Sequence, residues 1–98
     1  MRLTYHPEAE AELVEVAEFY EARSAGLGER FLQAYDTTVA EIAATPGLWP
    51  IAAADLRCRT MKRYPFSIYY RIIGDELRIL VIKHHRRHPD YWRHRLDS

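Results

Sequence analysis

The stretch from Phe66 to Lys83 reads FSIYYRIIGDELRILVIK, and its side chains alternate with a period of two residues. The alternate positions before the Gly74-Asp75 pair are apolar or aromatic: Phe66, Ile68, Tyr70 and Ile72. The alternate positions after it are also apolar: Leu77, Ile79 and Val81. This period indicates two β-strands, because successive side chains of a strand point to opposite faces of the sheet. Gly-Asp is typical of a tight turn between antiparallel strands. The stretch therefore predicts a β-hairpin.

A further strand is expected immediately before this hairpin. In Asp55–Met61, Leu56, Cys58 and Thr60 alternate with Arg57, Arg59 and Met61. Arg57, Arg59 and Arg71 share a strand parity that carries fewer aliphatic side chains than the opposite one. We therefore expect an apolar sheet face covered by helices and an opposite face that carries Arg and Tyr, with Cys58 buried as a small apolar residue. Residues 51–55 (IAAAD) are expected to form a loop or the entry to this strand.

The first half of the chain changes to a helical period. After a short strand at Arg2–Tyr5, a helix is expected from Pro7 to about Ser24, with an apolar stripe of Ala9, Leu13, Val16, Ala17 and Tyr20. Its acids Glu8, Glu12, Glu15 and Glu18 fall largely on the solvent side. A second helix is expected from about Glu29 to Ala44, with a stripe of Phe31 or Leu32, Tyr35, Val39 and Ile42. Gly26 and Gly28 make the connection short, so the helices should pack as an antiparallel hairpin.

These elements predict an α+β fold in the order β-α-α-β-β-β. A helical hairpin would cover one face of a small antiparallel sheet. At 98 residues, the chain is expected to form one domain, residues 1–98. It has no apolar run of the roughly 20 residues that a membrane helix needs, no apparent signal peptide and a single cysteine. We therefore expect a cytoplasmic protein without a membrane partner.

The formal net charge of zero conceals two halves of opposite charge. Residues 1–54 contain three Lys or Arg against nine Asp or Glu, whereas residues 55–98 contain eleven against five. Such asymmetry favours a polyanionic or acidic partner for the second half, although exposed charges often have no specific partner.

The stretch Val81–Leu96, VIKHHRRHPDYWRHRL, concentrates this positive charge and opens a basic C-terminal segment at about residues 84–98. Its imidazoles His84, His85 and His88 suggest zinc, but Pro89 breaks a helix and two Arg lie between them, so we expect no metal or other cofactor. Trp92 has two interpretations: an anchor at an interface, where Trp is enriched, or a side chain that packs back on the sheet.

Three pieces of the chain together resemble the RelE/ParE superfamily, the toxins of bacterial type II toxin–antitoxin systems. They are YHPEAEAEL at the first helix, RYPFSIYYRI before the Gly-Asp turn, and ILVIKHHRRHPDYW near the end. The chain is most similar to the ParE-like (plasmid stabilisation) branch. The resemblance implies a helical hairpin over a sheet and a cognate antitoxin, of ribbon-helix-helix type with an acidic C-terminal segment, that forms a hetero-oligomer with the toxin.

The superfamily has two activities, and the resemblance leaves both open. RelE-like toxins cleave mRNA on the ribosome without a metal, and ParE-like toxins inhibit DNA gyrase by protein–protein binding. A metal-independent endoribonuclease needs acid–base groups and cations for the phosphate. Here His85 and Tyr91, with Arg59 or Arg71, are the catalytic candidates.

Gyrase binding is the preferred interpretation because Phe66 and Ser67 stand where a RelE-like toxin carries its phosphate-binding Arg. In that interpretation no residue is catalytic. The candidate contacts to the target lie on the sheet and in the C-terminal segment: Arg59, Lys83, Arg86, Arg87, Tyr91 and Trp92.

Overall fold

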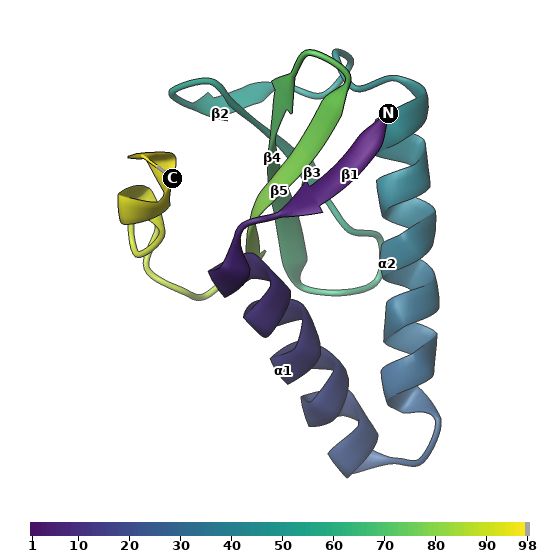
Figure 1. Ribbon diagram of the computed structural model, residues 1–98. Helices are drawn as coiled ribbons and strands as arrows, with labels where there is room; N and C mark the ends of the chain where they lie inside the picture. The colour runs from purple at the N-terminus through teal and green to yellow at the C-terminus, as the bar shows by residue number, and fades with distance from the viewer. Residues whose placement is uncertain (98) are drawn as a thin grey trace.

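The computed structural model describes residues 1–97, and it folds as two helices against one mixed sheet (Figure 1). The elements are β1 (Arg2–Tyr5), α1 (Pro7–Arg23), α2 (Leu27–Ala44), β2 (Ile51–Ala53), β3 (Leu56–Thr60), β4 (Phe66–Ile73), β5 (Glu76–His84) and a short 3-10 helix, η1 (Arg93–Asp97). The predicted α+β class and the helical hairpin are confirmed. Residues 51–53, for which the sequence allowed either a loop or the entry to the next strand, form the edge strand β2.

The strand order is β1-β5-β4-β3-β2, and one neighbouring pair departs from the prediction. β1 runs parallel to β5, whereas the other pairs are antiparallel. The sheet is therefore mixed, and its description as antiparallel was wrong for β1. No turn connects β1 to β5, because the helical hairpin and three strands lie between them in sequence. A four-residue strand thus carries no local signal of its direction.

The β4–β5 hairpin is confirmed, with Ile73 opposite Glu76 and Gly74 in the left-handed region at φ 59°. A bulge interrupts its register, since Tyr69 pairs with Val81 while Tyr70 pairs with Ile79. Leu80 is the extra residue. The alternation had predicted that Leu77, Ile79 and Val81 share one face of the sheet. This was wrong for Val81, because the bulge reverses the alternation of side chains in β5 after Ile79. Ile82 takes the helix-covered side instead.

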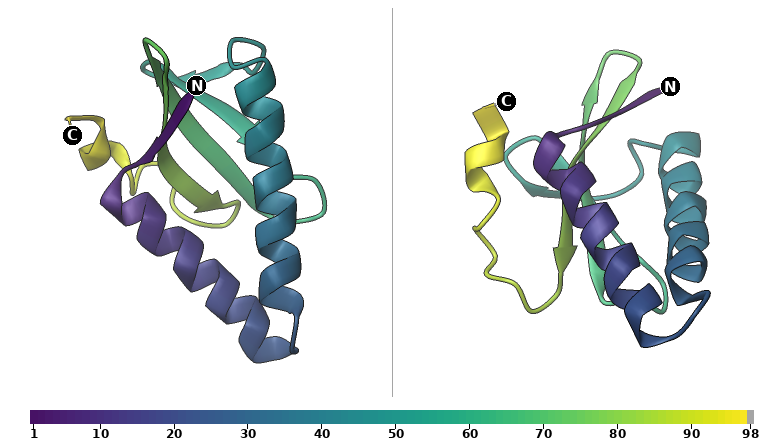
Figure 2. Two further views of the ribbon diagram at one scale, coloured as in Figure 1. Left: turned by 45° about the vertical axis from the view of Figure 1, so that its right-hand side comes forward. Right: turned by 60° about the horizontal axis from the view of Figure 1, so that its bottom comes forward.

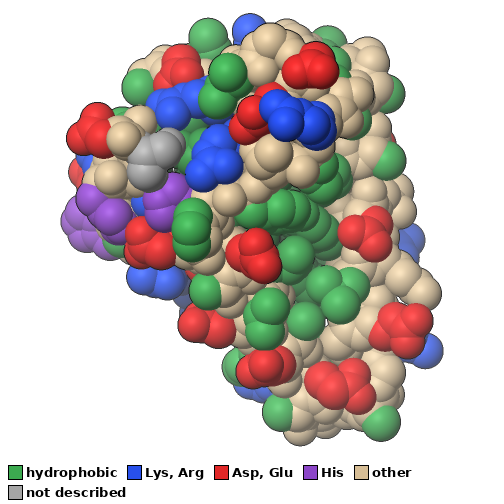
Figure 3. All heavy atoms as spheres, in the orientation of Figure 1, with side chains coloured by type: hydrophobic (Ala, Val, Ile, Leu, Met, Phe, Trp, Pro, Cys, Tyr) green, Lys and Arg blue, Asp and Glu red, His purple; other side chains and the backbone are tan. Residues whose placement is uncertain are grey.

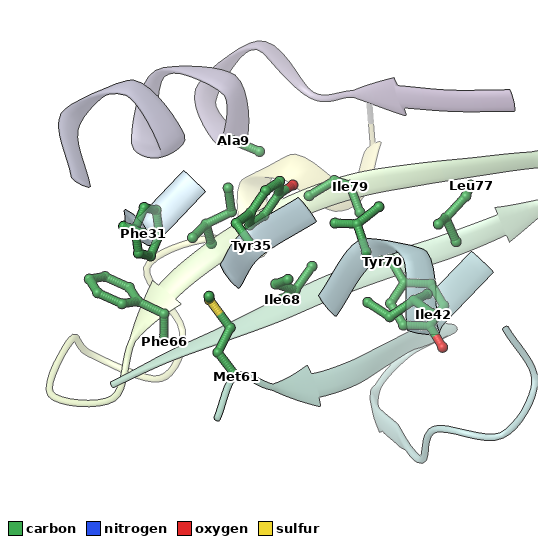
Figure 4. Packing of buried hydrophobic residues seen from close by; sticks show 12 residues of the cluster. Ala9, Phe31, Tyr35, Ile42, Met61, Phe66, Ile68, Tyr70, Leu77 and Ile79 are labelled. Atoms are coloured by element: carbon green, nitrogen blue, oxygen red, sulfur yellow. The ribbon is translucent and has the colours of Figure 1, made fainter. Parts of the chain in front are cut away.

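The main core lies between the sheet and the helical hairpin of α1 and α2, and Figure 4 shows its labelled side chains pointing toward one another. The predicted stripes of both helices are confirmed. Close packing depends on Gly28, where an added Cβ would lie 2.7 Å from the Ala17 carbonyl oxygen of α1. At the start of α1, Pro7 occupies the first turn and the His6 side chain accepts a hydrogen bond from the Glu8 N–H. Among residues 1–97, no helix has the length and apolar character to cross a membrane.

The opposite sheet face is covered by residues 85–97, which we call the C-terminal segment. In both views of Figure 2 the strands stand between α2 and η1. A second cluster forms there from Leu56, Leu80, Val81 and Trp92. The Trp92 side chain is only 2% exposed and its ring lies 5.4 Å from that of Tyr69. Of the two interpretations of Trp92, the structure therefore shows packing on the sheet.

The expected face of Arg and Tyr is divided between the two sides. Arg57 pairs with Tyr70 and Arg59 with Ile68, and directly opposite residues share a face. Both Arg therefore lie on the helix-covered side, contrary to the prediction. Arg71 and Tyr69 do lie on the opposite side, beside the C-terminal segment.

Candidate functional site

A buried ion pair joins the first helix to the C-terminal segment. Glu12 is 9% exposed and Arg95 is 3% exposed. The Arg95 Nη1 donates to Glu12 Oε1 at 2.8 Å, and its Nη2 donates to Oε2 at 3.0 Å. The expectation that Glu12 faces solvent was therefore wrong. Its position three residues after Ala9 and four before Val16 places it at the border of the apolar stripe.

The same pair occupies the edge of β5 beyond the end of β1. β1 pairs with β5 only as far as Ile79. Next along that edge, the Ile82 N–H donates to Glu12 Oε1 at 3.0 Å, and Arg95 Nη1 donates to the Leu80 carbonyl at 2.9 Å. A carboxylate and a guanidinium thus supply the acceptor and the donor that a neighbouring strand would offer.

Tyr91, one of the catalytic candidates, is held by this arrangement. Its hydroxyl donates to Glu12 Oε2 at 2.5 Å, and the Arg87 guanidinium lies 3.8 Å from the centre of its ring. Burial, followed by the hydrogen bond to Glu12, raises the pKa of Tyr91 well above its usual value. A half-buried phenol that already donates to a carboxylate is poorly placed to exchange a proton with RNA.

The other catalytic candidates do not converge on Tyr91. The His85 Nε2 lies 3.3 Å from Ser67 Oγ. Arg71 binds Asp55 at 2.6 Å through its Nε and the Leu96 carbonyl through its Nη atoms. Arg59 lies on the other face of the sheet, where its guanidinium stacks 4.2 Å from the Trp49 ring centre. The four side chains therefore do not form one constellation in this structure.

The candidate target contacts differ in their exposure. Arg86 and Arg87 are exposed in the loop after β5. Tyr91 and Arg59 are partly buried, and Arg59 also lies 3.7 Å from Glu41 of α2. Lys83 and Trp92 are 8% and 2% exposed, respectively. Their role in target binding stays a prediction, and Arg86 and Arg87 are the members of the set that are free to reach a partner.

The three imidazoles considered for zinc have local partners. The Nδ1 of His84 accepts from the Arg86 N–H, and the Nδ1 of His88 accepts from the Asp90 N–H. Among residues 1–97, no three His, Cys, Asp or Glu side chains are grouped to hold a metal ion. The basic segment anticipated at about residues 84–98 includes Ser98, which lies outside the described residues.

A hollow of about 270 Å³ lies between α1 and the end of β5, and we call it the α1–β5 groove. Its lining residues are Glu12, Glu15, Val16, Phe19, Tyr20, Phe66, Ile82, His84 and Arg87. The groove begins where the Glu12–Arg95 pair ends, beside the part of β5 that β1 does not cover. The groove is lined by two acids, Glu12 and Glu15, and one Arg. Figure 3 shows further acidic side chains along both helices of the helical hairpin, with hydrophobic side chains between them.

Sequence reasoning missed three residues that organise this region: Glu12, Arg95 and Ser67. Glu12 carried a signal, because it interrupts the apolar spacing of α1. Arg95 lies three residues after Trp92, but nothing local distinguishes it from the other cations of the segment. Ser67 was noted only for the Arg that it replaces.

The comparisons with known proteins agree with this fold. Residues 3–89 match a family model described as the ParE toxin of the type II toxin–antitoxin system parDE. A solved structure described as the chromosomal ParDE toxin–antitoxin system from P. aeruginosa matches with a TM-score of 0.63 and 26% sequence identity. The match covers 86% of this chain and 95% of that one. No curated protein matches the chain.

Proposed function

This chain belongs to the ParE toxin family of type II toxin–antitoxin systems, and we propose that it binds and inhibits DNA gyrase in the cytoplasm and is neutralised by a cognate antitoxin. The solved relative is itself described as a ParDE system. An antitoxin partner is therefore the natural expectation for this toxin.

The observation that carries the choice of gyrase is the separation of the nuclease candidates. The Tyr91 hydroxyl is engaged by Glu12 and the His85 imidazole by Ser67. Of the two Arg that could assist them, Arg71 is paired with Asp55 and Arg59 lies on the helix-covered face of the sheet. Metal-free RNA cleavage requires acid, base and cations within hydrogen-bond reach of one phosphate. Inhibition by binding has no such requirement, because it needs only a surface that the target recognises.

The exposed cations of the C-terminal segment supply such a surface. Arg86 and Arg87 lie in the loop after β5, and neither forms an ion pair among the described residues. Arg is enriched at the energetic centres of protein interfaces. Arg87 is further ordered by its position over the Tyr91 ring, which lowers the entropy lost when it binds.

Two assays on the purified toxin test this proposal: gyrase supercoiling in vitro and mRNA cleavage on translating ribosomes. We expect inhibited supercoiling and no cleavage. Arg86→Glu with Arg87→Glu should weaken inhibition by at least about tenfold, which is the loss of about 1.4 kcal/mol. Arg30→Glu, an exposed cation on α2, is the matched control and should act as wild type.

The alternative activity predicts the reverse result. Transcripts cut by wild type but not by His85→Ala or Tyr91→Phe, with supercoiling unaffected, would establish the endoribonuclease. That result would require the C-terminal segment to rearrange on the ribosome, because the candidates do not meet in the free protein.

For the antitoxin, we propose the α1–β5 groove as a docking site for its acidic C-terminal segment. The groove is lined by the apolar Val16, Tyr20 and Phe66 and by the cation Arg87. Its lining also includes Glu12, which is already paired with Arg95, and Glu15. An amphipathic acidic segment would bury its apolar side chains on the apolar residues and pair its acids with the cation. The exposed Phe19 at the groove is the anchor that such a segment would cover.

Coexpression with the antitoxin encoded beside the toxin gene tests the docking site. Phe19→Asp should weaken the complex by at least about tenfold, because it places a charge on an apolar contact. Val14→Asp is the matched control: Val14 is 51% exposed and Phe19 is 53% exposed, but Val14 does not line the groove. Equal affinity of the two variants, measured by calorimetry, would place the antitoxin elsewhere.

A further inference from the structure

A second hollow, of about 490 Å³, lies between α2 and the loop that joins β3 to β4, which Figure 1 shows beside that helix. Three of its lining residues are cations: Arg30 belongs to α2, and Lys62 and Arg63 belong to the loop. All three are exposed, and none of them forms an ion pair among residues 1–97. We call this site the α2–loop hollow.

The charge of the α2–loop hollow is unbalanced. Among the described residues, Glu41 is the only acid that lines it, and the Glu41 carboxylate already lies 3.7 Å from the Arg59 guanidinium. Like charges that surround one hollow repel one another. An anion that enters the hollow is attracted by all of them, because their potentials add. The α2–loop hollow therefore favours an anionic ligand.

The loop holds its cations in a fixed position. Arg63 lies in the left-handed region at φ 68°, which is uncommon for a residue with a side chain and persists only where neighbouring contacts impose it. Here the Tyr64 ring packs 5.4 Å from that of Tyr20 and 5.2 Å from that of Phe31. The Phe66 N–H donates to the Tyr64 carbonyl at 2.8 Å. Because the loop is ordered in the free protein, less entropy is lost when a ligand binds.

The surroundings of the hollow limit how far an anionic ligand can extend. Gln33 lines the α2–loop hollow and also a neighbouring hollow between α1 and α2. That neighbour is lined by four acids and, within residues 1–97, by no cation: Glu18, Glu21, Glu29 and Asp36. A nucleic-acid backbone carries a charge on every unit, so it would be repelled where it crosses α2. A peptide can place carboxylates on the cations and neutral side chains beyond them.

We propose that the α2–loop hollow binds an acidic peptide segment of a partner protein. The planar guanidinium groups of Arg30 and Arg63 can each hold a carboxylate through two parallel hydrogen bonds, and the Lys62 ammonium can hold a third carboxylate. The Gln33 amide supplies a donor and an acceptor for the peptide backbone. The site is separate from the α1–β5 groove and from the cations proposed to bind gyrase, so it goes beyond the proposed function.

A rhodamine-labelled peptide in which Glu alternates with Ala is the probe for this site. The same peptide with Gln in place of Glu is its control. Fluorescence anisotropy with the whole toxin should show binding of the Glu peptide and at least about tenfold weaker binding of the Gln peptide, because the charge-assisted hydrogen bonds are lost. Equal binding of the two peptides, or no binding of the Glu peptide, would overturn the site.

Lys62→Gln with Arg63→Asn removes both cations of the loop and should weaken binding of the Glu peptide by at least about tenfold. Asn is chosen at the second position because it adopts the left-handed conformation readily. Arg86→Gln with Arg87→Gln is the matched control, since it removes two exposed cations elsewhere, and it should bind the peptide as wild type does. An equal loss in both double variants would show attraction by net charge alone and would overturn the site.

Arg30→Glu separates this site from the target of the toxin. It reverses a charge that lines the hollow and should weaken binding of the Glu peptide by at least about tenfold. Inhibition of supercoiling should stay at the wild-type level, because that assay contains no acidic peptide. Unchanged binding of the Glu peptide would contradict the proposal. Labelled single-stranded DNA that binds more tightly than the Glu peptide, and is released by Arg30→Glu, would assign the hollow to nucleic acid instead.

Discussion

The two faces of the sheet are covered in different ways. One face, which we call the hairpin face, is covered by the helical hairpin of α1 and α2. It buries a large apolar cluster to which both helices contribute a regular apolar stripe. The other face is closed by a segment with one buried Trp and one buried Arg, whose carboxylate partner lies 83 positions away in sequence. On the hairpin face, each buried side chain has many neighbours, so the loss of one contact leaves the helices in place. On the second face, a few long-range contacts hold the whole segment.

The hairpin face should show the largest single effect. Phe31 is fully buried and contacts the rings of Tyr20, Tyr64 and Phe66. Phe31→Ala should lower the free energy of unfolding by about 3–5 kcal/mol, through lost burial and the cavity left behind. Urea denaturation measures this. Phe19→Ala on the exposed side of α1 is the control, with a change within about 0.5 kcal/mol.

On the other face, Arg95→Met should cost about 3 kcal/mol, because it leaves the buried Glu12 carboxylate without its cation. Arg93→Met is the matched control. Arg93 pairs with Asp90 at the surface, where such pairs contribute little. Glu12→Gln added to Arg95→Met should restore part of the stability, since the amide oxygen can still accept from Ile82. If Arg95→Met proves as stable as Arg93→Met, the segment is not held by this pair.

The contact between the two helices should show a smaller effect. Gly28→Ala places a Cβ 2.7 Å from the Ala17 carbonyl oxygen, so the helices must separate, at a cost of about 1–3 kcal/mol. Nothing lies within 4 Å of a Cβ at Gly47, and Gly47→Ala is the control. Trp92 lies on the far face, and a Trp49→Phe background leaves it as the single tryptophan of the chain. In that background the Trp92 fluorescence should be the same in both variants if the faces are independent. A shifted spectrum in Gly28→Ala would show that they are coupled.

The smallest effect concerns the exposed contact between α1 and the C-terminal segment. The His94 Nε2 lies 2.8 Å from Glu8 Oε2, and this hydrogen bond lowers the pKa of Glu8. A carboxyl whose pKa is lowered by folding stabilises the protein above its unfolded pKa, and this contribution is lost as the pH falls through the folded pKa. NMR titration should find the Glu8 pKa below about 4.3, its usual value, and closer to that value in His94→Ala. An identical pKa in both proteins would contradict the contact.

The sequence predicts the apolar residues of the hairpin face well, because the spacing of apolar residues within each helix or strand shows which of them are buried. The period of two in β4 and of 3.6 in α2 placed Ile68, Tyr70, Tyr35 and Ile42 correctly. Three features had no such local signal. The bulge at Leu80 changes the parity of β5, the register of β3 turns Arg59 toward α2, and the Glu12–Arg95 pair joins the two ends of the chain. Each depends on the partner strand or on a distant segment.

The candidate site divides in the same manner. The exposed cations Arg86 and Arg87 could be identified from composition alone, whereas the burial of Trp92 and Lys83 depends on where the C-terminal segment folds back. Residue type indicated the chemistry of His85 and Tyr91. Their separation by the hydrogen bonds to Ser67 and Glu12 is a property of the tertiary structure.

The ion pair on the edge of β5 also has a consequence for the protein in concentrated solution. An uncovered strand edge is a template on which another chain can pair and aggregate. Glu12 and Arg95 occupy the Ile82 N–H and the Leu80 carbonyl, so a second molecule cannot extend the sheet at these two positions. Arg95→Met should therefore aggregate on gentle heating before it unfolds completely. The Glu12–Arg95 pair thus protects the protein from edge-to-edge aggregation and also links the two ends of the chain.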